Sequence, residues 1–66
     1  MNTADKAASL TAREETILAL AAKGHTDKAI AESLGISKGT VEGHWVRIRL
    51  KLRAPSRTAV VALRAE

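Results

Sequence analysis

The chain has 66 residues, no cysteine and a formal net charge of +4. This length corresponds to one small domain or to part of a larger protein. Without cysteine there is no disulfide scaffold or thiolate metal site, which suits a reducing cytoplasm. No apolar run approaches membrane-spanning length and no segment resembles a signal peptide, so we expect a cytoplasmic protein without a membrane partner.

The positive charge is concentrated in the second half of the chain. Residues 1–34 carry four basic and five acidic side chains, whereas residues 35–66 carry seven basic and two acidic ones. Such an excess is the electrostatic footprint of a phosphate-binding face. A solvated surface with surplus Lys and Arg is the alternative interpretation.

The first predicted helix follows a polar segment. Residues 1–9 are small and polar without periodicity, so we expect a flexible arm or linker remnant ahead of one domain over residues 10–66. Thr11 and Glu14 have the spacing of a capping box, which predicts a helix start at Thr11. The helix is predicted to end at Gly24. The apolar residues that recur at helical spacing are Leu10, Ile17, Leu18 and Ala21.

Two further helices form the central motif. Thr26 is expected to cap the second helix, and Ser37 a third helix that runs to about Arg53. Between them lies a tight turn at Gly35 and Ile36, for which Gly supplies a left-handed backbone conformation. Two helices joined by a short turn that contains Gly are typical of a helix-turn-helix, whose second helix enters the DNA major groove.

A fourth helix is predicted after Pro55, which disfavours helical backbone at the preceding residue. Ser56 is expected to cap it. No strand pattern is present, so we predict an all-α fold: a compact domain of four short helices that contains the helix-turn-helix. The last helix has more apolar surface than one face buries, which predicts a weak homodimer. The residues expected at its interface are Val60, Val61, Ala62 and Ala65.

The third helix has two opposite faces. At about 100° per residue, one stripe is apolar and is expected to face the core; its members are Val41, Trp45, Ile48 and Leu52. Trp45 lies at its margin and is interpreted as a core residue, with stacking on a base or a partner as the alternative. The opposite face consists of Gly39, Gly43, Val46 and Leu50.

The side chains around this opposite face suit DNA in different ways. Arg47 is the predicted base reader, because a guanidinium can bind both acceptors of a guanine edge, and Val46 suits a thymine methyl group. Gly43 permits a close backbone approach to DNA, unless another helix packs there. The side chains suited to phosphates are Thr26, Lys28, Lys38, Thr40, Arg49 and Lys51. For any one Lys or Arg, a solvated charge is the alternative.

Two further residues of the third helix have competing interpretations. For His44 the two interpretations are that it binds a DNA backbone phosphate or that it closes the end of the core. Glu42 reads a cytosine amino group, restrains DNA binding or marks a protein interface, and we favour restraint. No Cys nucleophile, carboxylate pair or third ligand accompanies His25 or His44, so we expect no catalytic site, no metal site, no cofactor and no enzymatic activity.

These motifs resemble the LuxR/GerE-type DNA-binding domain over about residues 10–61. The resemblance rests on Leu10-Thr11-x-Arg13-Glu14, Gly24-x-Thr26-Asp27-Lys28-x-Ile30-Ala31, Leu34-x-Ile36-Ser37-x-x-Thr40-Val41-x-x-His44, Ile48-x-x-Lys51-Leu52 and Ser56-Arg57. His44 is the most specific of these residues. The resemblance implies the output domain of a bacterial transcription regulator, which binds DNA as a dimer through its last helix, normally behind a receiver or ligand-sensing domain.

The chain departs from this family pattern at a few positions. Glu42 stands where a basic residue is frequent, Ala29 stands where an acidic one is usual, and Gly43 and Val46 form fewer hydrogen bonds than the side chains often found there. Two other interpretations remain: region four of a sigma factor, or a protein-interaction module with little DNA binding. We favour sequence-specific binding to double-stranded DNA, with RNA polymerase as a further candidate partner.

Overall fold

The computed structural model describes residues 10–65, with side chains described for residues 10–63. Within the described range lie four helices: α2 (Ala12–Ala22), α3 (Asp27–Leu34), α4 (Lys38–Leu52) and α5 (Arg57–Ala65). The described residues contain no strand, so the predicted all-α fold is confirmed. None of these helices is long and apolar enough to cross a lipid bilayer. The expected arm, residues 1–9, lies outside the described part of the chain.

A side-chain hydroxyl caps the start of each helix. The capping oxygens accept a hydrogen bond of 3.1 Å from the amide three residues further on, and they belong to Thr11, Thr26, Ser37 and Ser56. In α2, the Thr11 amide also donates to the Glu14 carboxylate at 2.9 Å, which completes the capping box. The four predicted helix starts are therefore confirmed.

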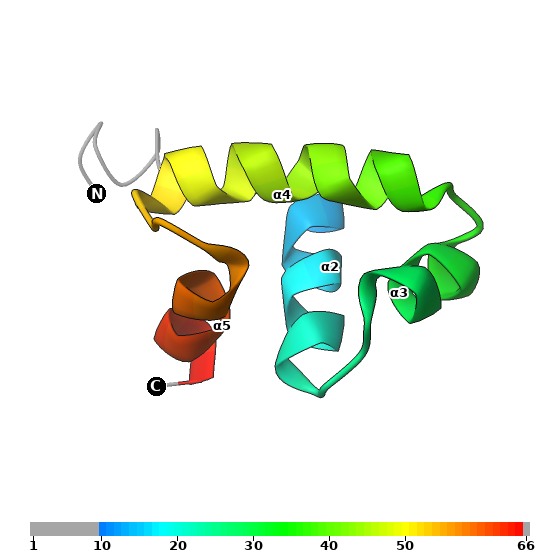
Figure 1. The fold of residues 1–66 in the computed structure, drawn as a ribbon, viewed down its shortest axis with the longest axis horizontal. Coiled ribbons are helices and arrows are strands. Elements are labelled where there is room, and N and C mark those ends of the chain that lie inside the picture. Colours follow the sequence, from blue (N-terminus) through cyan, green and yellow to red (C-terminus); the bar gives the residue numbers. More distant parts are fainter. Residues whose placement is uncertain (1–9, 66) are drawn as a thin grey trace.

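The long helix α4 extends along one edge of the domain, and α2, α3 and α5 all lie on the same side of α4 (Figure 1). The start of α2 meets the middle of α4, α3 lies near the N-terminal end of α4, and α5 packs against both α2 and α4. The turn between α3 and α4 is made at Gly35, whose φ of 68° is left-handed. The Ile36 amide closes the turn by donating to the Ala31 carbonyl at 3.0 Å. Helices α3 and α4 thus form the predicted helix-turn-helix.

All four helices contribute to one small apolar core. Its buried members are Ile17, Leu18, Ala21, Ile30, Ala31, Val41, Trp45, Ile48 and Val60. Trp45 is buried, as predicted, whereas Leu52 at the end of its stripe is only partly buried. The core therefore fixes one face of α4 and leaves the opposite face outside.

The structure corrects one residue of the expected dimer interface. Val60 is 0% exposed, because α5 turns it into the core formed with α2 and α4. It has no surface to offer a partner chain. On the same helix Val61 is partly buried, whereas Ala62 is exposed. The side chain of Ala65 lies outside the described residues.

The end of α4 uses an unusual residue. Arg53 adopts a left-handed backbone with φ of 54°, a conformation that glycine provides at most helix ends of this kind. The Ala54 amide then donates to the Arg49 carbonyl at 2.9 Å. The helix ends within one residue of the predicted position, just before Ala54 and Pro55.

Candidate nucleic-acid interface

The outer face of α4, defined as Gly39, Gly43, Val46 and Leu50, has no covering element among the described residues. Val46 is 47% exposed and Leu50 is 74% exposed. A Cβ atom added to Gly43 would meet nothing within 4 Å, and one added to Gly39 would meet only the Ser37 Oγ atom at 3.8 Å. No described helix therefore packs on the two glycines.

Charged side chains border this outer face on both sides. Arg47 is exposed on one side, where its Nη1 atom donates to the Gly43 carbonyl at a long 3.3 Å. One long, exposed hydrogen bond holds the guanidinium weakly, so this group is available to other hydrogen-bond acceptors. Arg49 and Glu42 lie on the other side. The Glu42 side chain is exposed and has no hydrogen bond or ion pair with any described residue.

Four of the six polar side chains expected at phosphates lie at the starts of α3 and α4. Thr26 caps α3 and Lys28 lies in its first turn, while Lys38 and Thr40 lie in the first turn of α4, and all four are exposed. The Thr40 hydroxyl lies 2.9 Å from the Ser37 hydroxyl. Helix N-termini attract anions through their free amides and dipole. Both first turns therefore suit phosphate groups.

Lys51 has a different role from the expected one. Its Nζ atom lies 2.7 Å from Oε1 of Glu14, a carboxylate that is only 2% exposed. The ammonium group thus has an internal partner, which corrects its expected role as a phosphate ligand. Burial raises the pKa of Glu14, but the hydrogen bonds from Lys51 and from the Thr11 amide outweigh that effect. The net result is a pKa below the ordinary value, so this carboxylate stays charged at neutral pH.

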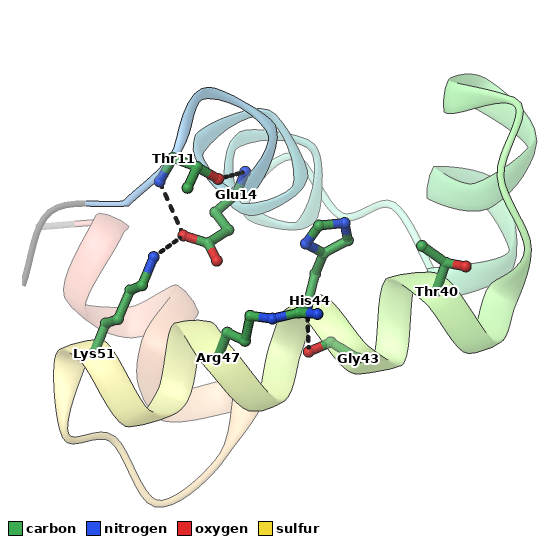
Figure 2. A pocket seen from close by; sticks show the side chains of 7 residues that line it. All are labelled: Thr11, Glu14, Thr40, Gly43, His44, Arg47 and Lys51. Atoms are coloured by element: carbon green, nitrogen blue, oxygen red, sulfur yellow. Dashed lines mark hydrogen bonds and ion pairs between the residues drawn. The ribbon is translucent and has the colours of Figure 1, made fainter.

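Beside this ion pair, a hollow of about 410 Å³ separates the start of α2 from α4 (Figure 2). The residues around it are Thr11, Glu14, Thr40, Gly43, His44, Arg47 and Lys51. His44 is partly buried and extends from α4 toward α2 (Figure 2). Its Nδ1 atom is buried without a partner among the described residues. His44 therefore lies between the two helices and borders the hollow beside the outer face of α4.

A second cluster, centred on Asp27, was not predicted from the sequence. Oδ1 of Asp27 accepts from the Trp45 indole at 2.9 Å and lies 2.6 Å from Nη1 of Arg57. Nη2 of Arg57 donates to the His25 carbonyl at 2.9 Å, and the guanidinium lies 5.0 Å from the centre of the Trp45 ring. The cluster joins the first turns of α3 and α5 to the middle of α4, so it fixes the orientation of α4. The sequence motifs that contain Asp27 and Arg57 were its only signals, and neither motif indicates that these two residues are partners.

A helix-turn-helix whose second helix presents an open, basic-flanked face defines a DNA-binding domain. The pattern of the family described as "Bacterial regulatory proteins, luxR family" matches residues 8–64. The chain belongs to this family, and it contains the LuxR-type helix-turn-helix DNA-binding domain of such regulators.

Named relatives agree with this assignment. The chain is 45% identical over 60 residues to the oxygen regulatory protein NreC of Staphylococcus aureus, in strains bovine RF122 / ET3-1 and MRSA252, with 91% of this chain and 28% of the relative covered. It is 45% identical over 53 residues to a protein of Pseudomonas aeruginosa strain PAO1 that is named provisionally as a transcriptional regulator, with 80% of this chain and 26% of the relative covered. The chain thus spans little more than a quarter of these relatives. No solved structure matches it significantly.

Proposed function

We propose that this domain binds double-stranded DNA in a sequence-specific manner in the bacterial cytoplasm, as the output domain of a transcription regulator. The observation that carries the proposal is the open outer face of α4, which lies opposite the core and is bordered by Arg47 and Arg49. In this arrangement α4 enters the major groove, Arg47 binds a guanine edge and phosphates bind along the flanks.

The residues assigned to phosphate binding lie at the two helix starts, where they are exposed, or beside the outer face, where Arg49 is partly buried. They are Thr26, Lys28, Lys38, Thr40 and Arg49, with His44 at the edge of the adjoining hollow. Lys51 is not among them, because its ammonium group pairs with Glu14. Phosphate contacts position the protein, whereas Arg47 distinguishes sequences.

We also propose a weak homodimer through α5 when the domain is bound to DNA. Val61 and Ala62 retain surface there, and the neighbouring Leu63 is 55% exposed. A two-fold dimer reads half-sites about one helical turn apart. RNA polymerase is a further proposed partner, because a regulator acts on transcription through it. Sedimentation of the complex with a selected duplex tests the dimer, and a purely monomeric complex contradicts it.

DNA binding is tested with a duplex selected from random sequences and with an unrelated duplex, each titrated at several salt concentrations. Each phosphate contact adds about −0.9 to the slope of log K against log salt. Arg47→Ala is expected to lose about 1–3 kcal/mol of preference for the selected duplex. Lys28→Ala is expected to weaken binding to both duplexes equally and to reduce the slope by about one contact.

Lys23→Ala is the matched control, because this exposed lysine ends α2 on the side away from α4 (Figure 1). It removes the same charge and is expected to change the slope little. Absence of binding to any duplex at low salt, or a flat salt dependence, contradicts the proposed function. Either result favours a protein-interaction module instead.

A further inference from the structure

The middle of the outer face of α4 is chemically unusual for a surface that meets base edges. Gly39, Gly43, Val46 and Leu50 recur at helical spacing and share one line along the helix. None of them carries a side-chain hydrogen-bonding group. The charged residues Arg47 and Glu42 lie to either side of this line. The line itself therefore offers only hydrocarbon and bare backbone to a partner.

The two glycines leave space that the domain itself does not use. Glycine is disfavoured in a helix relative to alanine, and nothing described packs against either one. Along a line with two missing Cβ atoms, the helix backbone can come closer to a facing surface than an ordinary helix. The next residue on the line, Val46, is 47% exposed and projects toward that surface.

The positive charges around the apolar line favour DNA as the surface that faces it. Arg47 and Arg49 flank the apolar line, and Lys38 begins the helix. Cations on both sides of an apolar strip match the phosphates on both sides of a groove. Within the major groove, the apolar group available for contact is the C5 methyl of thymine.

We propose that α4 recognises A·T pairs through thymine methyl groups, which pack against Val46 and against the bare backbone at Gly43. This inference rests on the proposed function and adds the chemistry of the target. The half-site then contains thymines that face the apolar line. Arg47, which lies beside this line, binds a neighbouring guanine. Discrimination on the line comes from shape and methyl burial rather than from hydrogen bonds.

The experiment compares the selected duplex with copies in which one thymine at a time is replaced by deoxyuridine. The replacement removes only the C5 methyl group, and affinity is measured by fluorescence anisotropy at fixed salt. Loss of one buried methyl is expected to weaken binding about three- to fourfold at one or two positions of each half-site. Val46→Ala is expected to bind the thymine duplex and the deoxyuridine duplex equally well where the replaced thymine is the one that Val46 contacts.

Gly43→Ala tests the close approach. The added methyl group has open space in the free domain, so the variant is expected to melt at a higher temperature and yet bind the selected duplex at least tenfold more weakly. Thr16→Ala is the matched control, because it raises helix propensity on the exposed side of α2 and leaves α4 unchanged. It is expected to raise the melting temperature without weakening binding.

The outcomes separate this inference from the proposed function. If wild-type protein binds the selected duplex but no deoxyuridine replacement weakens binding, the thymine assignment is overturned and DNA binding stands. If Gly43→Ala binds as tightly as wild type, the close approach is refuted. If no duplex is bound at all, the proposed function fails, and the inference fails with it.

Discussion

The Nζ atom of Lys51 lies 2.7 Å from the same Glu14 oxygen that accepts the Thr11 amide at 2.9 Å. One buried carboxylate therefore caps the start of α2 and also holds the last turns of α4 (Figure 2). Because α4 carries the proposed DNA-facing residues, this ion pair links the packing of the core to the orientation of the proposed interface.

The lowered pKa of Glu14 predicts a loss of stability in acid. The carboxylate is favoured in the folded state, so its contribution is fully present above the ordinary pKa of about 4.3 and is lost as the pH falls through the lower folded value. Thermal unfolding followed by circular dichroism between neutral pH and pH of about 2 measures this loss. Glu14→Gln is expected to flatten the profile, whereas Glu32→Gln, at an exposed carboxylate of α3, is expected to leave it nearly unchanged.

Lys51→Met separates stability from DNA binding. The substitution leaves the buried Glu14 carboxylate without its cation and is expected to cost about 1–3 kcal/mol of unfolding free energy. Because Lys51 is not a proposed phosphate ligand, the folded variant is expected to keep the wild-type salt slope on DNA. A slope reduced by one contact, as expected for Lys28→Ala, contradicts this assignment.

Features that depend on neighbouring residues were predictable from the sequence. A hydroxyl at Thr11 or Ser37 caps an amide three residues away, and helical spacing alone places Val41 and Ile48 on one face. Such features are set within one or two turns of a helix. The helix-turn-helix followed from them.

Features that depend on distant residues were not predictable in the same way. Val60 and Val61 are adjacent, and only the docking of α5 decides that Val60 enters the core. Lys51 was assigned to phosphates because a partner 37 residues earlier leaves no periodic trace in the sequence. For the same reason, the contact of Asp27 with Arg57 becomes visible only when the helices are assembled.

Arg57→Ala tests the Asp27 cluster. The substitution removes an ion pair, a hydrogen bond to the His25 carbonyl and the cation beside the Trp45 ring. We expect a loss of about 1–2 kcal/mol in unfolding free energy, since the groups are partly exposed. Trp45 is the single tryptophan, so its fluorescence in the folded state is expected to change as well. Unchanged fluorescence and unchanged stability contradict a positioning role, and Arg13→Ala on α2 is an exposed control.

Arg53→Gly is expected to stabilise the domain. Arg53 holds a left-handed backbone that costs a residue with a Cβ atom about 1–2 kcal/mol, and glycine removes that strain while adding freedom to the unfolded chain. The net gain is expected to be about 1 kcal/mol or less. Urea unfolding measures it as a higher midpoint at constant slope. A lower midpoint shows that the Arg53 side chain contributes more than its backbone strain removes.

The role of Glu42 is decided by reversing its charge. Its carboxylate is exposed beside the outer face and has no partner among the described residues, so Glu42→Lys breaks no internal contact. We expect restraint: a carboxylate near phosphates opposes binding, and the reversal tightens binding to two unrelated duplexes while steepening the salt slope by about one contact per subunit. Glu32→Lys makes the same charge change on α3 and is the control for net charge.

Two other outcomes of this titration contradict restraint in different ways. If Glu42 accepts a hydrogen bond from a cytosine amino group, Glu42→Lys changes which of the two duplexes is preferred rather than tightening both. In that case Glu42→Gln also weakens binding to the preferred duplex, because the charged acceptor is lost. If Glu42 belongs to a protein interface, both substitutions leave DNA affinity at the level of the Glu32→Lys control. Restraint alone predicts that Glu42→Gln lies between wild type and Glu42→Lys on both duplexes, because affinity then follows the charge at this one position.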